Sequence, residues 1–185
     1  MFFRQNKQKN KNQRRKFTTG FTLVETLVAI SILMLAVTGP LYYASEALRA
    51  ATYAKDQITA FYLAQDAFEQ IRKIRDENIY SSNNWNNGLI GCQSECLVNA
   101  SGFCKIDQVQ NEDSKFLYIN ENGVYTHSTS RTTKTIFKRT VTIIPTDGVD
   151  GTWDNATEMK VTVKMEWNNH GKREFTAYEF LRNFK

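Results

Sequence analysis

One carboxylate, Glu25, lies in an apolar segment that carries no other charge. The segment spans residues 21–44, and the cations Arg14, Arg15 and Lys16 precede it. An ionised acid at the centre of a membrane helix costs roughly 2.5 to 3.5 kcal/mol on insertion scales, so such residues tend to face a partner. We therefore expect Glu25 either to meet a partner group or to lie at the level of the lipid headgroups.

Three cysteines, Cys92, Cys96 and Cys104, lie close together in the sequence. Disulfides persist in oxidising compartments, and the orientation argued below places this segment in one. We favour one disulfide that joins Cys104 to Cys92 or Cys96, which leaves one thiol. The alternative is a zinc site that uses all three with His127 or His170, but the paired CxxC spacing of such sites is missing.

The segment "TDGVDGTWDN" clusters Asp147, Asp150 and Asp154. Oxygen-rich loops of this kind can hold calcium. The spacing does not match an EF-hand, however, and a solvated turn between strands uses the same residue types. We favour the turn, keep calcium as the alternative metal, and expect no cofactor.

Several cations fall on strands whose outward faces we expect to be exposed. They are Arg131, Lys134, Lys138, Arg139, Lys160 and Lys164. Nucleic acid is one candidate ligand for such faces, while ordinary solvated charge is the favoured interpretation. With two histidines, no phosphate-binding Gly-rich loop and no nucleophile motif, the sequence does not predict an enzyme.

The charge of this 185-residue chain is uneven. The formal net charge is +5, yet the first 20 residues hold seven basic residues and no acid, which leaves 17 basic against 19 acidic residues in the rest. The segment 1–20 is polar, basic and expected to be disordered. The basicity therefore belongs to a leader and gives no indication of what the remaining chain binds.

The apolar segment 21–44 is long enough to cross a bilayer core of about 30 Å as a helix. Positive charge before the span places the N-terminus in the cytoplasm and residues from about 45 onward outside it. A secretory signal peptide has a shorter apolar region followed by a small-residue cleavage site. We therefore predict one membrane span and an extracytoplasmic domain over residues 45–185.

The helix is predicted to continue beyond the span to about residue 78. Its polar half carries one apolar stripe at helical spacing. The stripe comprises Ala51, Ala54, Ile58, Phe61, Ala64, Phe68 and Ile71. Gly39 and Pro40 interrupt the helical pattern, and we expect a kink or local melting there because proline lacks the backbone donor.

After the turn "SSNNWNNG" the apolar period changes from 3.6 to 2. We expect strands over residues 116–119, 123–127, 135–145, 158–167 and 172–181. The last three should form an antiparallel meander with one buried face, covered by the amphipathic half of the helix. The predicted fold class is α+β, a long N-terminal helix packed on a small antiparallel sheet.

The segment "GFTLVETLVAISILMLAV", residues 20–37, resembles the N-terminal signature of type IV pilins and type II secretion pseudopilins. It is most similar to that of minor pilins and minor pseudopilins. The resemblance implies cleavage by a prepilin peptidase between Gly20 and Phe21 and N-methylation of Phe21. Thr19 departs from the pattern, since Lys or Arg often precedes the glycine, and the leader is longer than most.

The resemblance also implies a role for Glu25. Cleavage after Gly20 would create an α-amine at Phe21, and Glu25 of one subunit would meet that amine on a neighbour. The implied partners are the prepilin peptidase, other pilin or pseudopilin subunits, the inner-membrane assembly platform and the membrane. The alternative function is an uncleaved, single-span surface protein that binds DNA or a glycan.

Overall fold

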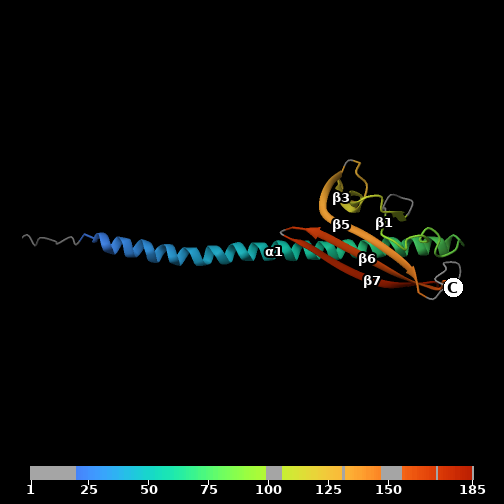
Figure 1. Ribbon diagram of the computed structural model, residues 1–185, viewed down its shortest axis with the longest axis horizontal. Coiled ribbons are helices and arrows are strands. Elements are labelled where there is room, and N and C mark those ends of the chain that lie inside the picture. Colours follow the sequence, from blue (N-terminus) through green and yellow to red (C-terminus); the bar gives the residue numbers. More distant parts are fainter. Residues whose placement is uncertain (1–19, 99–105, 131, 147–155, 170, 185) are drawn as a thin grey trace, which may run out of the picture. The chain divides into compact units, whose positions relative to one another are not determined.

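The computed structural model describes residues 20–98, 106–130, 132–146, 156–169 and 171–184. The chain forms two compact units, Met1–Leu48 and Arg49–Lys185. One long helix, α1 (Leu23–Tyr80), contributes residues to both units. All of the strands belong to the second unit (Figure 1).

The helix α1 ends in the asparagine-rich turn that the sequence predicted. Asn83 donates its backbone N–H to the Asn78 carbonyl at 2.9 Å, and Ser82 adopts a left-handed backbone with φ 57°. The Asn78 side chain then donates to the Asn87 carbonyl at 2.7 Å. These bonds occupy groups at the helix end and fix the turn that follows it.

The second unit holds a seven-stranded sheet. Its strands are β1 (Cys96–Val98), β2 (Ile106–Gln108), β3 (Phe116–Asn120), β4 (Tyr125–Thr126), β5 (Thr132–Pro145), β6 (Glu158–Asn168) and β7 (Lys172–Arg182), with a 3₁₀ helix η1 (Glu112–Lys115) before β3. On one edge of β5, β1 and β3 pair with different parts of the strand, and β2 and β4 follow them, in the order β2-β1-β5-β3-β4. On the other edge of β5 the sheet continues with β6 and then β7. All pairs are antiparallel, and β5 pairs with β1, β3 and β6.

The strands β5, β6 and β7 form the predicted meander. On β6 the burial alternates residue by residue, so Met159, Val161, Val163, Met165 and Trp167 all point into the core. Cross-strand register sets Val163 of β6 beside Val141 of β5 and Ala177 of β7. Alternation with one buried face is what a half-covered antiparallel sheet requires, and the predicted α+β class is confirmed.

The sheet buries one stripe of α1. Its members are Ala60, Leu63, Ala64, Ala67, Phe68, Ile71 and Ile74, in one core cluster with β5 and β6. The predicted stripe was right from Ala64 onward and wrong nearer the N-terminus, where Ile58 and Phe61 remain 57% and 49% exposed. Fully buried residues of α1 begin only at Ala60. The buried stripe also includes Leu63, Ala67 and Ile74, which the prediction left out.

Candidate functional site: the N-terminal segment and the sheet domain

The backbone at Gly20 and Phe21 is accessible. A Cβ added at Gly20 would meet no atom within 4 Å, and the Phe21 side chain is 80% exposed. The described part of the chain therefore supplies no steric reason for a glycine at this position. Any requirement for glycine has to come from a molecule that acts on this segment.

Glu25 lies in the first turn of α1, next to a helix cap. Thr22 precedes the helix, and its Oγ1 accepts the backbone N–H of Glu25 at 3.2 Å. Thr-x-x-Glu is the sequence pattern of a capping box, and an acid in the first turn interacts favourably with the helix dipole. This local role of residues 22–25 was not predicted, although their sequence "TLVE" matches the capping-box pattern.

The part of α1 that follows Glu25 is long and apolar enough to cross a membrane. Its large apolar side chains are exposed on every side of the helix, including Leu27, Val28, Ile30, Leu33 and Leu35. Apolar residues on all faces are typical of a helix that is surrounded by an apolar environment. This segment fits a single-pass membrane protein.

At Gly39 and Pro40 the helix α1 continues without interruption. The expected local melting is therefore not seen, while the expected kink remains a prediction. Thr38 just before them donates its hydroxyl to the Met34 carbonyl at 2.7 Å, a bond that keeps a polar side chain satisfied within the apolar segment.

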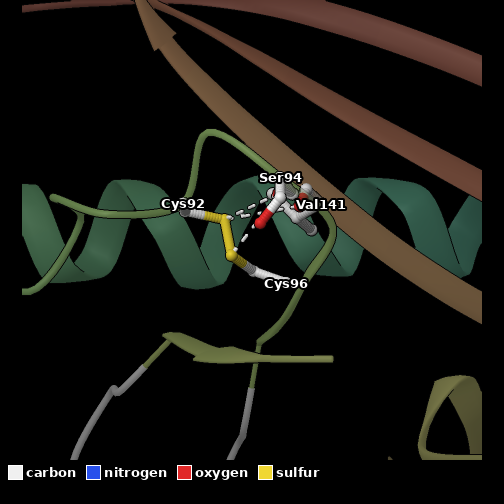
Figure 2. Close-up of a disulfide and its surroundings, with 4 residues drawn as sticks. All are labelled: Cys92, Ser94, Cys96 and Val141. Carbon is white, nitrogen blue, oxygen red and sulfur yellow. Dashed lines mark hydrogen bonds between the residues drawn. A yellow bond between two sulfur atoms is a disulfide. The ribbon is translucent and has the colours of Figure 1, made fainter. Parts of the chain in front are cut away.

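A disulfide joins Cys92, in the loop before β1, to Cys96, the first residue of β1 (Figure 2). Their Cα atoms are 5.8 Å apart, within the range that a disulfide spans. The favoured pairing with Cys104 is therefore corrected, because the turn at Ser94 already brings the nearer pair together. Cys104 itself lies outside the described residues.

The disulfide is buried against β5. Both cysteines are 1% exposed, and Cys92 Sγ lies 3.4 Å from the Val141 carbonyl oxygen. A disulfide sulfur has no proton to donate, so this is a packing contact. The Cys92 carbonyl accepts the Ile143 N–H at 2.7 Å, which fastens the loop to the sheet.

The sequence predicted that Arg139 lies on an outward face of its strand, and this prediction was wrong. It is 1% exposed and points toward α1, because it alternates in phase with the buried Val141 and Ile143. Its Nη1 donates to the Leu63 carbonyl at 3.0 Å and to Asp66 Oδ2 at 2.8 Å. Arg139 is a structural tie between β5 and α1.

The other predicted surface cations are mostly paired with acids. Lys134 binds Asp113 at 3.0 Å, Lys138 binds Glu112 at 3.2 Å, and Lys164 binds Glu166 at 3.1 Å. Arg131 lies outside the described residues, and Lys160 sits 4.6 Å from the centre of the Tyr178 ring. Exposed lysines already paired with carboxylates favour the interpretation as ordinary solvated charge over a site for nucleic-acid phosphates.

His127 is mostly buried beside Arg139. Its Nδ1 lies 3.1 Å from the Ser114 carbonyl oxygen and 3.2 Å from that of Phe116, and its Nε2 has no hydrogen-bond partner within the described ranges. Burial, and then the charge of Arg139, lower the pKa of His127 to about 4. The imidazole is therefore neutral at pH 7, with Nδ1 as its donor.

The structure brings together no metal ligands over the residues that it describes, where no group of three His, Cys, Asp or Glu side chains lies close enough to hold an ion. The calcium candidates Asp147, Asp150 and Asp154 lie outside those residues, as does His170. With Cys92 and Cys96 joined in a disulfide, neither can serve as a thiolate ligand for zinc.

Comparison with known proteins points to the N-terminal segment. Residues 15–39 match the family model of the prokaryotic N-terminal methylation motif, a range that includes Gly20, Phe21 and Glu25. No curated protein and no solved structure matches the chain. The motif points to a structural protein rather than an enzyme and, together with the long apolar helix, it indicates a type IV pilin-like prepilin.

Proposed function

We propose that this chain is a subunit, and a minor one, of a type IV pilus or a type II secretion-like pseudopilus. The observation that carries the proposal is the methylation motif at residues 15–39, followed by a helix that is apolar on all sides. Residues 1–20 form the cytoplasmic leader, residues 21–44 the membrane and assembly helix, and residues 45–185 the extracytoplasmic domain.

The proposed processing step is hydrolysis of the Gly20–Phe21 peptide bond by a prepilin peptidase. Support comes from the open surroundings of Gly20, where the chain's own fold leaves room for a Cβ. A narrow peptidase site explains a glycine that the fold does not need, because only glycine lacks the Cβ. The new amine at Phe21 is then methylated.

Mass spectrometry of the N-terminus in the membrane fraction tests this step. We expect a chain that starts at methylated Phe21, and an intact chain for Gly20→Ala with unchanged tryptophan fluorescence. Thr19→Lys tests the departure from the usual motif and should raise the processed fraction. A wild-type chain that still begins at Met1 would favour the alternative, an uncleaved surface protein that binds DNA or a glycan.

The proposed role of Glu25 is to register subunits as they leave the bilayer. In a stack of subunits its carboxylate can meet the protonated α-amine of Phe21 on a neighbour, which compensates a charge that is costly in lipid. The capping contact with Thr22 is compatible with this role, since that bond uses the Glu25 backbone N–H and leaves the carboxylate oxygens available.

Two variants separate registry from capping. Glu25→Gln keeps the size of the side chain and the backbone bond to Thr22 but removes the charge, and Thr22→Ala removes the cap but keeps the charge. We expect Glu25→Gln to be cleaved normally but not to be incorporated into filaments. Thr22→Ala should be incorporated into filaments like the wild-type chain. Normal incorporation of Glu25→Gln would show that the registry role is wrong.

A further inference from the structure

The strand β7 (Lys172–Arg182) is the edge of the sheet on the side opposite β1 and β3. It pairs with β6 along its whole length, and no strand in the described part of the chain pairs with its other side (Figure 1). Such an edge presents backbone N–H and C=O groups that can bind another strand. Its outward side chains include Tyr178 and Phe180, which are 62% and 51% exposed.

We propose that β7 pairs antiparallel with β7 of a second copy of this chain, around a two-fold axis at Tyr178. In this register Tyr178 faces Tyr178 of the second copy, and Glu174 faces Arg182 of the second copy on both sides of the axis. On the inner face Phe175 lies opposite Leu181 of the second copy. Like residues therefore meet at the centre, and opposite charges meet toward both ends.

The charged partners in this register are accessible. The side chains of Glu174 and Arg182 are 62% and 67% exposed, and each contacts one residue of its own chain, Lys164 at 3.5 Å and Glu158 at 2.5 Å. Carboxylates and guanidinium groups can bind more than one partner. The contact between copies therefore adds to the bonds already present.

Neighbouring registers are less favourable. An axis at Ala177 sets Lys172 against Arg182, and an axis at Glu179 sets that carboxylate against its own copy, both of which are like-charge contacts. An axis between two residues would place outward side chains opposite inward ones.

An axis at Thr176 sets Glu179 against Arg173 of the second copy. Glu179 faces inward and its carboxylate is already held at both oxygens by Arg72. The guanidinium of Arg173 in turn lies 5.1 Å from the centre of the Tyr53 ring. The axis at Tyr178 is thus the one that uses exposed and complementary charges.

This contact is additional to assembly through the N-terminal helix. Subunits stacked head to tail in a polar filament are related by a screw rotation, and a two-fold axis cannot relate them. Where the proposed function holds, the pairing joins subunits of two separate filaments, or two subunits outside a filament. The second copy is therefore a lateral partner rather than a neighbour in the stack.

Cysteine cross-linking of the full chain in detergent tests the register. Tyr178→Cys, in a Cys104→Ser background that keeps the Cys92–Cys96 disulfide, should give a disulfide-linked dimer on mild oxidation. Thr162→Cys is the matched control, because Thr162 lies directly beside Tyr178 on the same face but one strand away from the edge. Equal dimer yields, or none from Tyr178→Cys, would overturn the proposal.

Charge reversal with mixing gives a second test. In the Tyr178→Cys background, we expect Glu174→Arg or Arg182→Glu alone to lower the dimer yield roughly ten-fold, since like charges then oppose each other twice. A mixture of the two variants restores opposite charges at both contacts and should recover the yield. Any effect of a substitution on its own chain persists in the mixture, so only the contact between copies can restore the yield. A mixture whose dimer yield stays low would contradict the pairing.

The test is independent of the proposed function. Cross-linking is measured on the unprocessed chain, whereas removal of the leader is measured by mass spectrometry. A chain that is cleaved but does not cross-link contradicts the lateral pairing alone. A chain that cross-links but keeps its leader contradicts the prepilin role alone.

Discussion

Ile30 and Ile71 belong to the same helix, but their surroundings differ. Ile30, in the unit Met1–Leu48, is 54% exposed, whereas Ile71, in the unit Arg49–Lys185, is completely buried. In the first unit apolar side chains cover all faces of α1, whereas in the second the sheet buries one stripe of them and leaves others, such as Ile58 and Phe61, exposed. The comparison shows that apolar composition without a polar face indicates an environment outside the chain, while a stripe indicates packing within it.

The largest effect should come from truncating the buried isoleucine. Ile71→Ala removes core atoms and leaves a cavity, which typically costs about 2 to 5 kcal/mol of the free energy of unfolding. All three tryptophans follow residue 84, so their fluorescence in denaturant reports on the second unit. Ile30→Ala is the control and should change that transition by less than about 0.5 kcal/mol. Equal losses would contradict the contrast between the two units.

The partly buried His127 should make the second unit sensitive to acid. The unfolded chain takes up a proton at His127 near pH 6.5 and the folded chain only near pH 4. Stability is therefore undiminished above pH 6.5, falls as the pH drops through this window, and has lost about 3 kcal/mol below pH 4. His127→Gln should flatten the pH dependence of the tryptophan transition, and an unchanged slope would contradict the assignment.

Opening the disulfide should have a smaller effect. The Cys92–Cys96 bridge closes a very short loop, for which the chain-entropy relation gives about 2 kcal/mol. We expect Cys92→Ser with Cys96→Ser to lower the stability of the second unit by this amount, and Cys104→Ser to leave it unchanged. Peptide mapping of the oxidised chain checks the pairing, and a peptide that links Cys104 to Cys92 or Cys96 would contradict it.

The smallest effect should come from the polar face of α1. Arg72 forms an ion pair with Glu179 of β7 and with Glu69 of the helix. The Arg72 side chain is 40% exposed, so solvent screens the pair, and Glu179→Gln should cost at most about 1 kcal/mol. Glu69→Gln, at a site that is 69% exposed, should cost less, and 1 M salt should reduce the difference. A loss for Glu179→Gln that salt does not change would contradict an ionic origin.

The sequence predicted the elements whose pattern is long and regular. The helix and the strands β5, β6 and β7 follow from an extended apolar segment and from clean alternation, and the structure confirms them. The strands β1 and β2 were missed because each has only three residues. Three residues are too few to display a period.

For individual side chains the prediction was less complete. Arg139 was assigned to the surface because it is charged, although its place between Thr140 and Lys138 sets it in phase with buried residues. A guanidinium that is paired and hydrogen-bonded can be buried. The Leu63 carbonyl accepts a hydrogen bond from Arg139, a long-range contact that the sequence does not predict. At Glu25 the motif indicated the functional hypothesis, while the cap from Thr22 was missed although the Thr-x-x-Glu pattern of residues 22–25 indicates it.

The central position of β5 has a consequence for biosynthesis. The apolar stripe of α1 is complete once Ile74 has been made, but the meander β5, β6 and β7 that shares its core cluster begins only at Thr132. At about 5 to 20 residues per second, a ribosome needs roughly 3 to 12 s to add the intervening chain. During that time the stripe lacks the central strands of the sheet and follows a long apolar segment, so the nascent chain is expected to need a chaperone or early membrane targeting.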